Sequence, residues 1–219
     1  MSMASPKEGV LRRVELSDVR APKPLMPAEI ERCLTPRQRQ VLDSLETLVV
    51  SVELADMTMA QIAAQVNCSL RTLYGILPSK EELVLTILDR RLHRIGRTAI
   101  ESMDPEESPL VNLRRYLRAA HEAVQPTGGV LSEDYKKTPG HRGLAEAHEK
   151  YLVGIVKGLL DQALSQGDII PIDTWTMAYV LGGLGRDFLS PNVRTEISES
   201  PKDAADAALE VIIRGLSTS

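Results

Sequence analysis

"NCSLRTLYGILPSKEELV", residues 67–84, brings a helix end, two helix starts and a proline into one short stretch. Asn67 tolerates the left-handed backbone conformation that ends a helix, and Ser69 belongs to the residue types that cap the start of the next one. Pro78 cannot continue that helix, and Ser79 can cap another. The stretch therefore predicts one short helix that begins at Ser69 and ends before Pro78.

A second short helix precedes this stretch. Thr58 and Gln61 have the spacing of a capping box, and Ile62, Ala63 and Val66 then recur at helical spacing. Two short helices joined by a tight turn form the helix-turn-helix layout, whose second helix enters the major groove of DNA with its N-terminal residues facing the bases. The alternative is a helical hairpin whose polar residues only face water.

The polar residues of the stretch predict a DNA-binding surface. Arg71 is the candidate for a base contact, because a guanidinium can donate two hydrogen bonds to guanine. Tyr74 and Lys80 are candidates for phosphate contacts, and Lys80 lies in the first turn of a helix, where the helix dipole also attracts an anion. Arg37 is a further phosphate candidate. The full predicted set is Arg37, Ser69, Leu70, Arg71, Thr72, Tyr74 and Lys80.

Outward from this motif the chain predicts an all-α fold. Thr35, Pro36 and Gln38 indicate the start of the first helix of a three-helix helix-turn-helix domain, residues 35–98, which ends in a long helix. Residues 1–34 combine several prolines with mixed charges and no sustained period, which predicts a flexible arm. Longer helical patterns then fill a larger domain, with expected helix starts at Ser108, Leu144, Asp173 and Ser200 and with bounds of 99–219.

The composition favours a helical protein of the cytoplasm. Hydrophobic residues make up 43% of the 219 residues, which suffices for a core, and aromatic residues make up only 3%. The 2 cysteines are too few for a disulfide framework. No apolar run reaches the ~18 residues that span a bilayer, and no signal peptide is evident. We therefore expect a cytoplasmic protein without a membrane partner.

The charge is distributed unevenly. The chain carries 26 basic and 30 acidic residues, a net charge of -4, which taken alone argues against a nucleic-acid partner. Residues 1–100 nevertheless hold 14 basic against 12 acidic side chains, whereas residues 101–219 hold 12 against 18. This asymmetry favours a DNA-binding face in the first hundred residues.

No pattern predicts an enzyme. The metalloprotease, nucleophile-elbow and phosphate-loop motifs are missing from the sequence. His141 and His148 would share a helix face only within one helix, and Gly143 argues against that. The "GGLG" at 182–185 has no strand before it, so we interpret it, like Gly154 and Gly158, as a site of close helix packing. We predict no catalytic residue, no metal site and no cofactor.

Residues 57–84, "MTMAQIAAQVNCSLRTLYGILPSKEELV", resemble the helix-turn-helix of the TetR family of transcriptional regulators, as do the helix before them and the helical body after them. Asn67 replaces the usual turn glycine of that family, and Ile76 and Leu77 stand where aromatic residues are usual. "LTPRQRQVL" at 34–42 looks like the start of a LuxR-type domain, but that pattern has no place for the rest of the motif. The residues that match the TetR motif are Thr58, Ile62, Ala63, Ser69, Thr72, Leu73, Tyr74, Ser79, Lys80, Glu81 and Leu83.

The resemblance implies a homodimeric, ligand-responsive regulator, usually a repressor, that binds a palindromic operator and leaves it when a small effector binds residues 99–219. The candidate effector-lining residues are Tyr116, His121 and Tyr151, and we expect an apolar effector. The alternative is a helical protein-interaction module that keeps the fold without specific DNA reading. The resemblance places the dimer interface on the two C-terminal helices, with candidates Trp175, Leu181, Gly182, Gly185, Leu209, Ile212 and Ile213.

Overall fold

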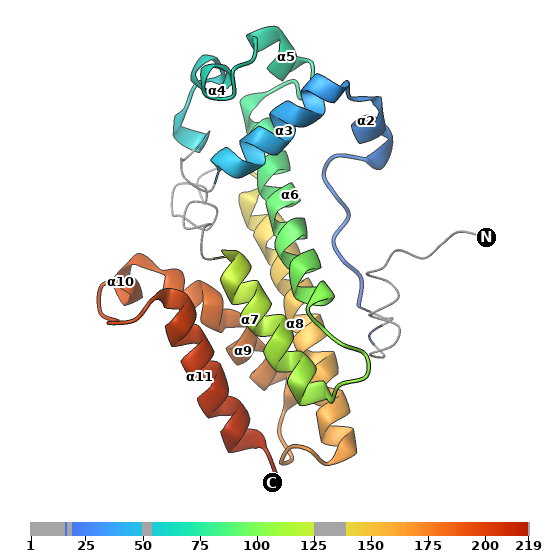
Figure 1. Ribbon diagram of the computed structural model, residues 1–219, viewed down its shortest axis with the longest axis vertical. Helices are drawn as coiled ribbons and strands as arrows, with labels where there is room; N and C mark the ends of the chain where they lie inside the picture. The colour runs from blue at the N-terminus through green and yellow to red at the C-terminus, as the bar shows by residue number, and fades with distance from the viewer. Residues whose placement is uncertain (1–15, 17–18, 50–53, 125–138, 219) are drawn as a thin grey trace, which may run out of the picture. The chain divides into compact units, whose positions relative to one another are not determined.

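The structure, a computed structural model, describes residues 16, 19–49, 54–124 and 139–218 (Figure 1). Within these ranges the chain is all-α, as predicted, and its extended backbone pairs only in an isolated bridge between Ile169 and Ser217. None of the helices described there is long and apolar enough to cross a membrane. The helices are α2 (Ala28–Cys33), α3 (Pro36–Leu48), the 3-10 turn η1 (Leu54–Asp56), α4 (Met59–Gln65), α5 (Leu70–Tyr74), α6 (Lys80–Glu101), α7 (Pro109–Val124), α8 (His141–Gln166), α9 (Thr174–Leu189), α10 (Pro191–Arg194) and α11 (Pro201–Leu216).

The chain divides into two compact units, which we call the head and the body. The head consists of the described parts of residues 23–94 and 126–147, and the body consists of the described parts of residues 1–22, 95–125 and 148–219. The division falls between Arg94 and Ile95, inside α6. The head therefore holds most of the predicted DNA-binding domain and also α2 and the start of α8.

The first three helices of the predicted DNA-binding domain begin at their capping residues. Thr35 with Gln38 and Thr58 with Gln61 form complete capping boxes on α3 and α4, and Ser69 caps α5 with its hydroxyl. Each cap gives a partner to an N–H group that the helix itself leaves unbonded. These three helix starts are thus confirmed. The head core gathers Val41, Leu42, Leu45, Ile62, Ala63, Leu73, Leu83, Val84, Ile87 and Leu88.

A cluster of charges fastens α6 to α2 and α3 within the head. Arg90 of α6 pairs with Glu31 of α2, and its Nη2 lies 3.2 Å from Asp43 Oδ1 of α3. Arg94 donates to Glu46 Oε2 at 2.7 Å, and the Glu46 side chain is only 2% exposed. A carboxylate buried to this extent needs cationic partners. The cluster therefore helps to fix how α3 lies on α6.

The described part of the predicted flexible arm differs from that prediction, because it contains the short helix α2 and is anchored at a few apolar positions. In the body, Leu16 is buried and Val19 is partly buried against the core, and both lie over the glycine-lined side of α8. In the head, the Leu25 N–H donates to Asp89 Oδ2 at 2.8 Å, and the Met26 side chain is buried in the core. These apolar anchors could not be predicted from periodicity, because prolines and charged residues separate them and they recur at no regular spacing.

Gly158 provides the space that Leu16 occupies. A Cβ on Gly158 would lie 2.1 Å from Leu16 Cδ2, whereas a Cβ on Gly143, in the same helix, would have no neighbour within 4 Å. Alanine favours a helix interior over glycine by about 1 kcal/mol. Gly143 lies in the first turn of α8, so we predict that Gly143→Ala raises the free energy of unfolding by at most about that amount. Gly158→Ala should give no such gain, because Leu16 must move. Denaturant unfolding measures both variants, and equal gains would contradict the prediction.

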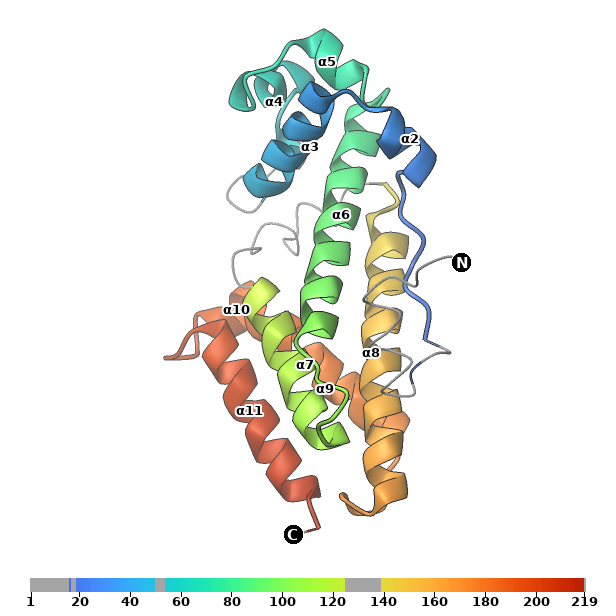
Figure 2. The same cartoon turned by 45° about the vertical axis from the view of Figure 1, so that its right-hand side comes forward.

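Close packing at glycines also organises the body, where α11 lies against α7 and α9 (Figure 2). A Cβ on Gly182 of α9 would lie 2.7 Å from Leu152 Cδ2 of α8, and a Cβ on Gly185 would lie 2.9 Å from His121 Cδ2 of α7. The packing role predicted for the "GGLG" segment is therefore confirmed. The body core includes Ile100, Leu113, Tyr116, Leu117, Tyr151, Val156, Leu159, Leu160, Leu181, Leu209 and Ile213.

Helix α8 differs from the prediction at its start. It begins at His141 rather than Leu144, and it contains both His141 and His148. The expectation that Gly143 would keep these histidines out of one helix is therefore wrong. A single glycine costs a helix only about 1 kcal/mol, which the remaining turns of a long helix readily offset.

Candidate nucleic-acid interface

The turn before α5 has the backbone that its sequence predicts. Asn67 has a φ of 49°, the only positive φ among the described residues other than glycine. The Cys68 N–H donates to Ala63 O at 2.9 Å, which closes the end of α4. Ser69 Oγ then accepts from the Thr72 N–H at 3.1 Å and lies 2.9 Å from Thr72 Oγ1. The left-handed asparagine and the serine cap together turn the chain sharply from α4 into α5.

The outer side of α5 carries most of the predicted DNA-binding residues. Ser69, Leu70 and Arg71 are exposed at its N-terminal end, and Tyr74 is 53% exposed. Leu73, between them, is fully buried in the head core. An exposed leucine and tyrosine on so short a helix give it apolar and hydroxyl contact groups besides its one cation. The helix is thus anchored by a single buried side chain and exposes its other side.

Lys80 lies at the first residue of α6, as predicted. Ser79 caps this helix by accepting from the Glu82 N–H at 3.1 Å. Ile76 and Leu77, which stand where the TetR motif usually has aromatic residues, pack into the head core as a buried and a half-buried side chain. Their aliphatic side chains therefore fill the interior, and the exposed ring in this segment is that of Tyr74.

Two residues of α3 contact the backbone at the two ends of α5. Arg37 Nη2 donates to Asn67 O at 2.6 Å, just before α5. Gln38 Nε2 donates to Gly75 O at 2.8 Å, just after it. Arg37 was predicted as a phosphate contact, and its guanidinium is here bonded to the protein backbone. Gln38 was predicted only as a capping residue, because no sequence pattern records which distant carbonyl an amide will reach.

The three candidate effector residues lie inside the body. Tyr116 and Tyr151 belong to the body core, where burial raises the pKa of both phenols, that of Tyr151 to about 12. The nearby hydroxyl of Tyr151 raises the Tyr116 pKa further. His121 is also buried, at the Gly185 contact of α9. Their role in binding an effector stays a prediction.

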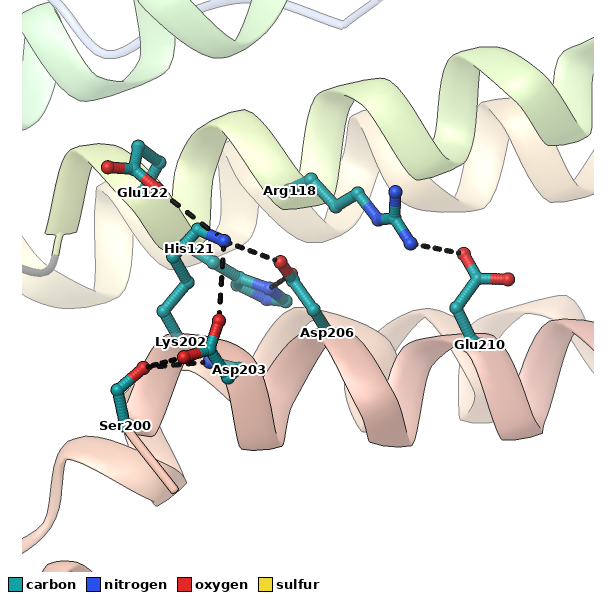
Figure 3. Close-up of polar contacts among 8 residues, drawn as sticks. All are labelled: Arg118, His121, Glu122, Ser200, Lys202, Asp203, Asp206 and Glu210. Carbon is teal, nitrogen blue, oxygen red and sulfur yellow. Dashed lines mark hydrogen bonds and ion pairs between the residues drawn. The ribbon is translucent and has the colours of Figure 1, made fainter.

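His121 belongs to a polar cluster that joins α7 to α11 (Figure 3). Its Nδ1 lies 2.8 Å from Asp206 Oδ1, and Lys202 Nζ lies 3.0 Å from the other oxygen of the same carboxylate. Lys202 also approaches Glu122 of α7 at 3.6 Å. One turn further along, Glu210 accepts from Arg118 at 3.1 Å. Charge pairing thus ties α7 to α11.

The burial of His121 predicts a dependence of stability on pH. Desolvation lowers the pKa of His121, and the hydrogen bond to Asp206 opposes this without reversing it. Above the ordinary histidine pKa of about 6.5 the ring is neutral in folded and unfolded chains alike. Below it the unfolded chain binds the proton first, so stability falls as the pH falls until the folded ring is protonated too.

We therefore expect His121→Asn to reduce the loss of unfolding free energy on acidification from about pH 7 to 5. One proton limits the difference in slope to about 1.4 kcal/mol per pH unit. Urea unfolding of the wild type and the variant across this range measures it. Identical slopes in the two proteins would contradict the prediction.

The residues predicted at the dimer interface differ in how exposed they are in the single chain. Leu181, Leu209 and Ile213 are 0% exposed and belong to the chain's own core. Gly182 and Gly185 face α8 and α7 of the same chain, and Ile212 is half-buried. Only Trp175 of the predicted set is exposed.

The apolar residues that α9 and α11 do expose were not all predicted. On α9, Tyr179 is 57% exposed beside Trp175, with the two rings stacked at 6.2 Å between centroids and Lys157 Nζ 5.2 Å from the tryptophan ring. On α11, Val211 is 71% exposed, and Ala207 and Gly215 flank it at intervals of four residues. Each helix thus presents an outer stripe that the chain's own core leaves uncovered.

Comparison with solved structures shows which proteins share this fold. A TetR-like transcriptional regulator from Rhodococcus sp. is 25% identical, with a TM-score of 0.62 over 82% of this chain and 94% of its own. A putative fatty acid metabolism regulator from Clostridium perfringens is 16% identical, with a TM-score of 0.63 over 82% of this chain and 100% of its own.

A putative transcriptional regulator from Saccharomonospora viridis, solved in complex with choline, is 16% identical, with a TM-score of 0.69 over 84% of this chain and 98% of its own. No family profile and no curated protein sequence matches the chain. The likeness is therefore one of fold, and it extends over both the head and the body.

Proposed function

We propose that this chain, which has the fold of the TetR family of transcriptional regulators, is a ligand-responsive repressor that binds a palindromic operator as a homodimer. The observation that carries the proposal is the exposed N-terminal end of α5, where Ser69, Leu70 and Arg71 stand outside a helix-turn-helix core that buries Leu73. The N-terminal end is the part of a recognition helix that meets base edges in the major groove.

The side chains of this surface suit two kinds of contact with DNA, one to base edges and one to phosphates. Arg71 supplies a fork of donors for a guanine edge. Tyr74 supplies an exposed hydroxyl, and Lys80 supplies a charge at the start of α6, so both suit phosphate oxygens. Phosphate contacts position the protein and base contacts select the sequence. A role on chromosomal DNA fits the cytoplasmic location expected from the sequence.

A homodimer would place two copies of α5 on successive turns of one face of the duplex. The outer stripes of α9 and α11 support such a dimer, because Trp175, Tyr179 and Val211 would otherwise leave apolar surface in water. Small residues beside Val211 allow a partner helix to approach closely. Half-sites about 34–36 Å apart, or a multiple of that spacing, would follow.

The proposed effector is a small, largely apolar molecule bound in the body. The aliphatic and tyrosine-containing core around Tyr116 and Tyr151 supports this class, and the relatives whose names mention choline and fatty acid metabolism make small metabolites reasonable first candidates. Release requires the effector to bind the DNA-free form more tightly than the DNA-bound form, and the ratio of the two affinities sets the size of the response.

The decisive experiment is the selection of bound duplexes from a random pool, followed by a salt titration of the selected site. We expect a palindromic consensus and an affinity that falls steeply with salt, as phosphate contacts release counterions. Repeating the selection with choline, with acyl compounds and with neither identifies the effector class. If no duplex is enriched, the repressor proposal fails and the protein-interaction module takes its place.

A further inference from the structure

We propose that Gln38 and Arg37 are positioning residues that hold the recognition helix α5 at both of its ends. The inference rests on the proposed function, because it concerns how accurately α5 is presented to DNA. It assigns to two neighbouring residues of α3 a role that neither a capping pattern nor a positive charge would reveal.

Helix α5 needs such support because it is very short. It spans only Leu70–Tyr74, and Leu73 is its only buried side chain. A helix of this length has no stability of its own in water, since nucleating the first turn costs more than one turn returns. A single buried side chain also leaves the helix free to rotate about that anchor. Bonds at its two ends therefore contribute to its direction, together with the core residues Val66 and Ile76 that flank it.

The two bonds from α3 meet this need. Arg37 Nη2 donates to Asn67 O at 2.6 Å, in the left-handed turn that precedes α5. Gln38 Nε2 donates to Gly75 O at 2.8 Å, immediately after α5. A carbonyl at the end of a helix has no partner within the helix, so a side-chain donor there is stabilising. Two points fixed by one rigid helix define a direction, whereas one point does not.

Gln38 is held in place for this task by its other atom. Its Oε1 accepts from the Thr35 N–H at 2.9 Å and from Thr35 Oγ1 at 3.0 Å, which leaves the amide nitrogen to donate across to α5. Gly75 permits the approach, because a Cβ there would lie 3.3 Å from Gln38 Nε2. One amide therefore caps α3 and fastens the far end of α5.

Gln61 provides a matched control for the substitution of Gln38. Gln61 occupies the same capping-box position on α4, where its Oε1 accepts from the Thr58 N–H at 2.8 Å and from Thr58 Oγ1 at 2.9 Å. No contact of its amide nitrogen corresponds to the Gln38–Gly75 bond in the described part of the chain. Gln38→Glu and Gln61→Glu both keep the capping acceptor and both add one negative charge. Only Gln38→Glu removes a donor from α5.

The first test does not involve DNA. We expect Gln38→Glu to speed hydrogen exchange of the α5 amides, including that of Gly75, by at least about fivefold relative to Gln61→Glu, the factor expected for losing one ordinary hydrogen bond. Exchange in α3 should be alike in the two variants, because both keep their caps. Equal exchange of the α5 amides in the two variants would overturn the assignment of Gln38.

The second test uses the operator selected with the wild-type protein. We expect Gln38→Glu to lower the ratio of specific to non-specific affinity by about fivefold or more, and Gln61→Glu to leave that ratio unchanged although it carries the same charge. An equal loss in both variants would overturn the proposal. Failure of the wild type to select any duplex would refute the proposed function instead, and the exchange measurement would still decide whether Gln38 holds α5.

For Arg37, the salt dependence of operator affinity distinguishes a positioning role from a phosphate contact. Arg37→Gln should lower sequence preference and leave the slope of log affinity against log salt unchanged. A phosphate contact would do the opposite, with a slope smaller by about one and an unchanged preference. That second outcome would overturn the positioning role of Arg37 and restore its predicted role on the DNA backbone.

Discussion

Arg71→Ala should reduce the preference of the protein for its operator over random duplex by about 5- to 150-fold, the range covered by one good bidentate base contact. Arg71 is exposed at the N-terminal end of α5, and its side chain has no part in the head core. The fold should therefore survive the substitution. Competition binding of the wild type and the variant, against the selected site and against single-base changes, measures the loss and identifies the base concerned.

Loss of charge alone would also weaken binding, so the experiment needs a second arginine. Arg97→Ala removes the same charge from an exposed position on the body part of α6. We expect this control to change specific and non-specific affinity equally and only slightly. If Arg71→Ala behaves in the same way, with uniform weakening and an unaltered base preference, Arg71 is a backbone contact and another residue of α5 reads the sequence.

The local structure of the head was predictable because its signals are local. Thr35 and Thr58 with their glutamines, Ser69 and Asn67 each act within a few residues, and the structure has every one of these features. The bond from Gln38 to Gly75 joins residues 37 positions apart, and its existence depends on how α3 lies against α5. Periodicity and capping rules relate residues only a few positions apart, so they could not predict the bond from Gln38 to Gly75.

The body shows a different limit of prediction. Helices α9 and α11 each carry apolar residues on more than one side, and helical spacing indicates which residues share a side but not what that side meets. Leu181, Leu209 and Ile213 were predicted to lie at the dimer interface, yet they are buried in the chain's own core. Leu16 presents the same difficulty, because one apolar residue in a proline-rich segment has no period at all. Packing partners distant in sequence decide such cases.

Tyr179→Asp and Val211→Asp should convert the proposed dimer into a monomer and weaken operator binding by about 100-fold or more, because linking two binding modules multiplies affinity by about that factor. Both side chains are largely exposed in the single chain, at 57% and 71%, so a charge at either position leaves the body core intact. Burying a carboxylate in an apolar interface costs several kcal/mol unless a cation pairs with it.

Sedimentation equilibrium and operator titration together test this expectation, with Ile170→Asp as the control. Ile170 is an exposed aliphatic residue that belongs to neither α9 nor α11, so the same charge there should leave both mass and affinity unchanged. A dimer that persists in both α9 and α11 variants would place the interface elsewhere on the body. A second outcome would be a loss of operator affinity in a protein that stays dimeric. It would mean that the stripes affect how the heads bind DNA and do not join two subunits. Only dissociation removes the linkage between the two half-sites.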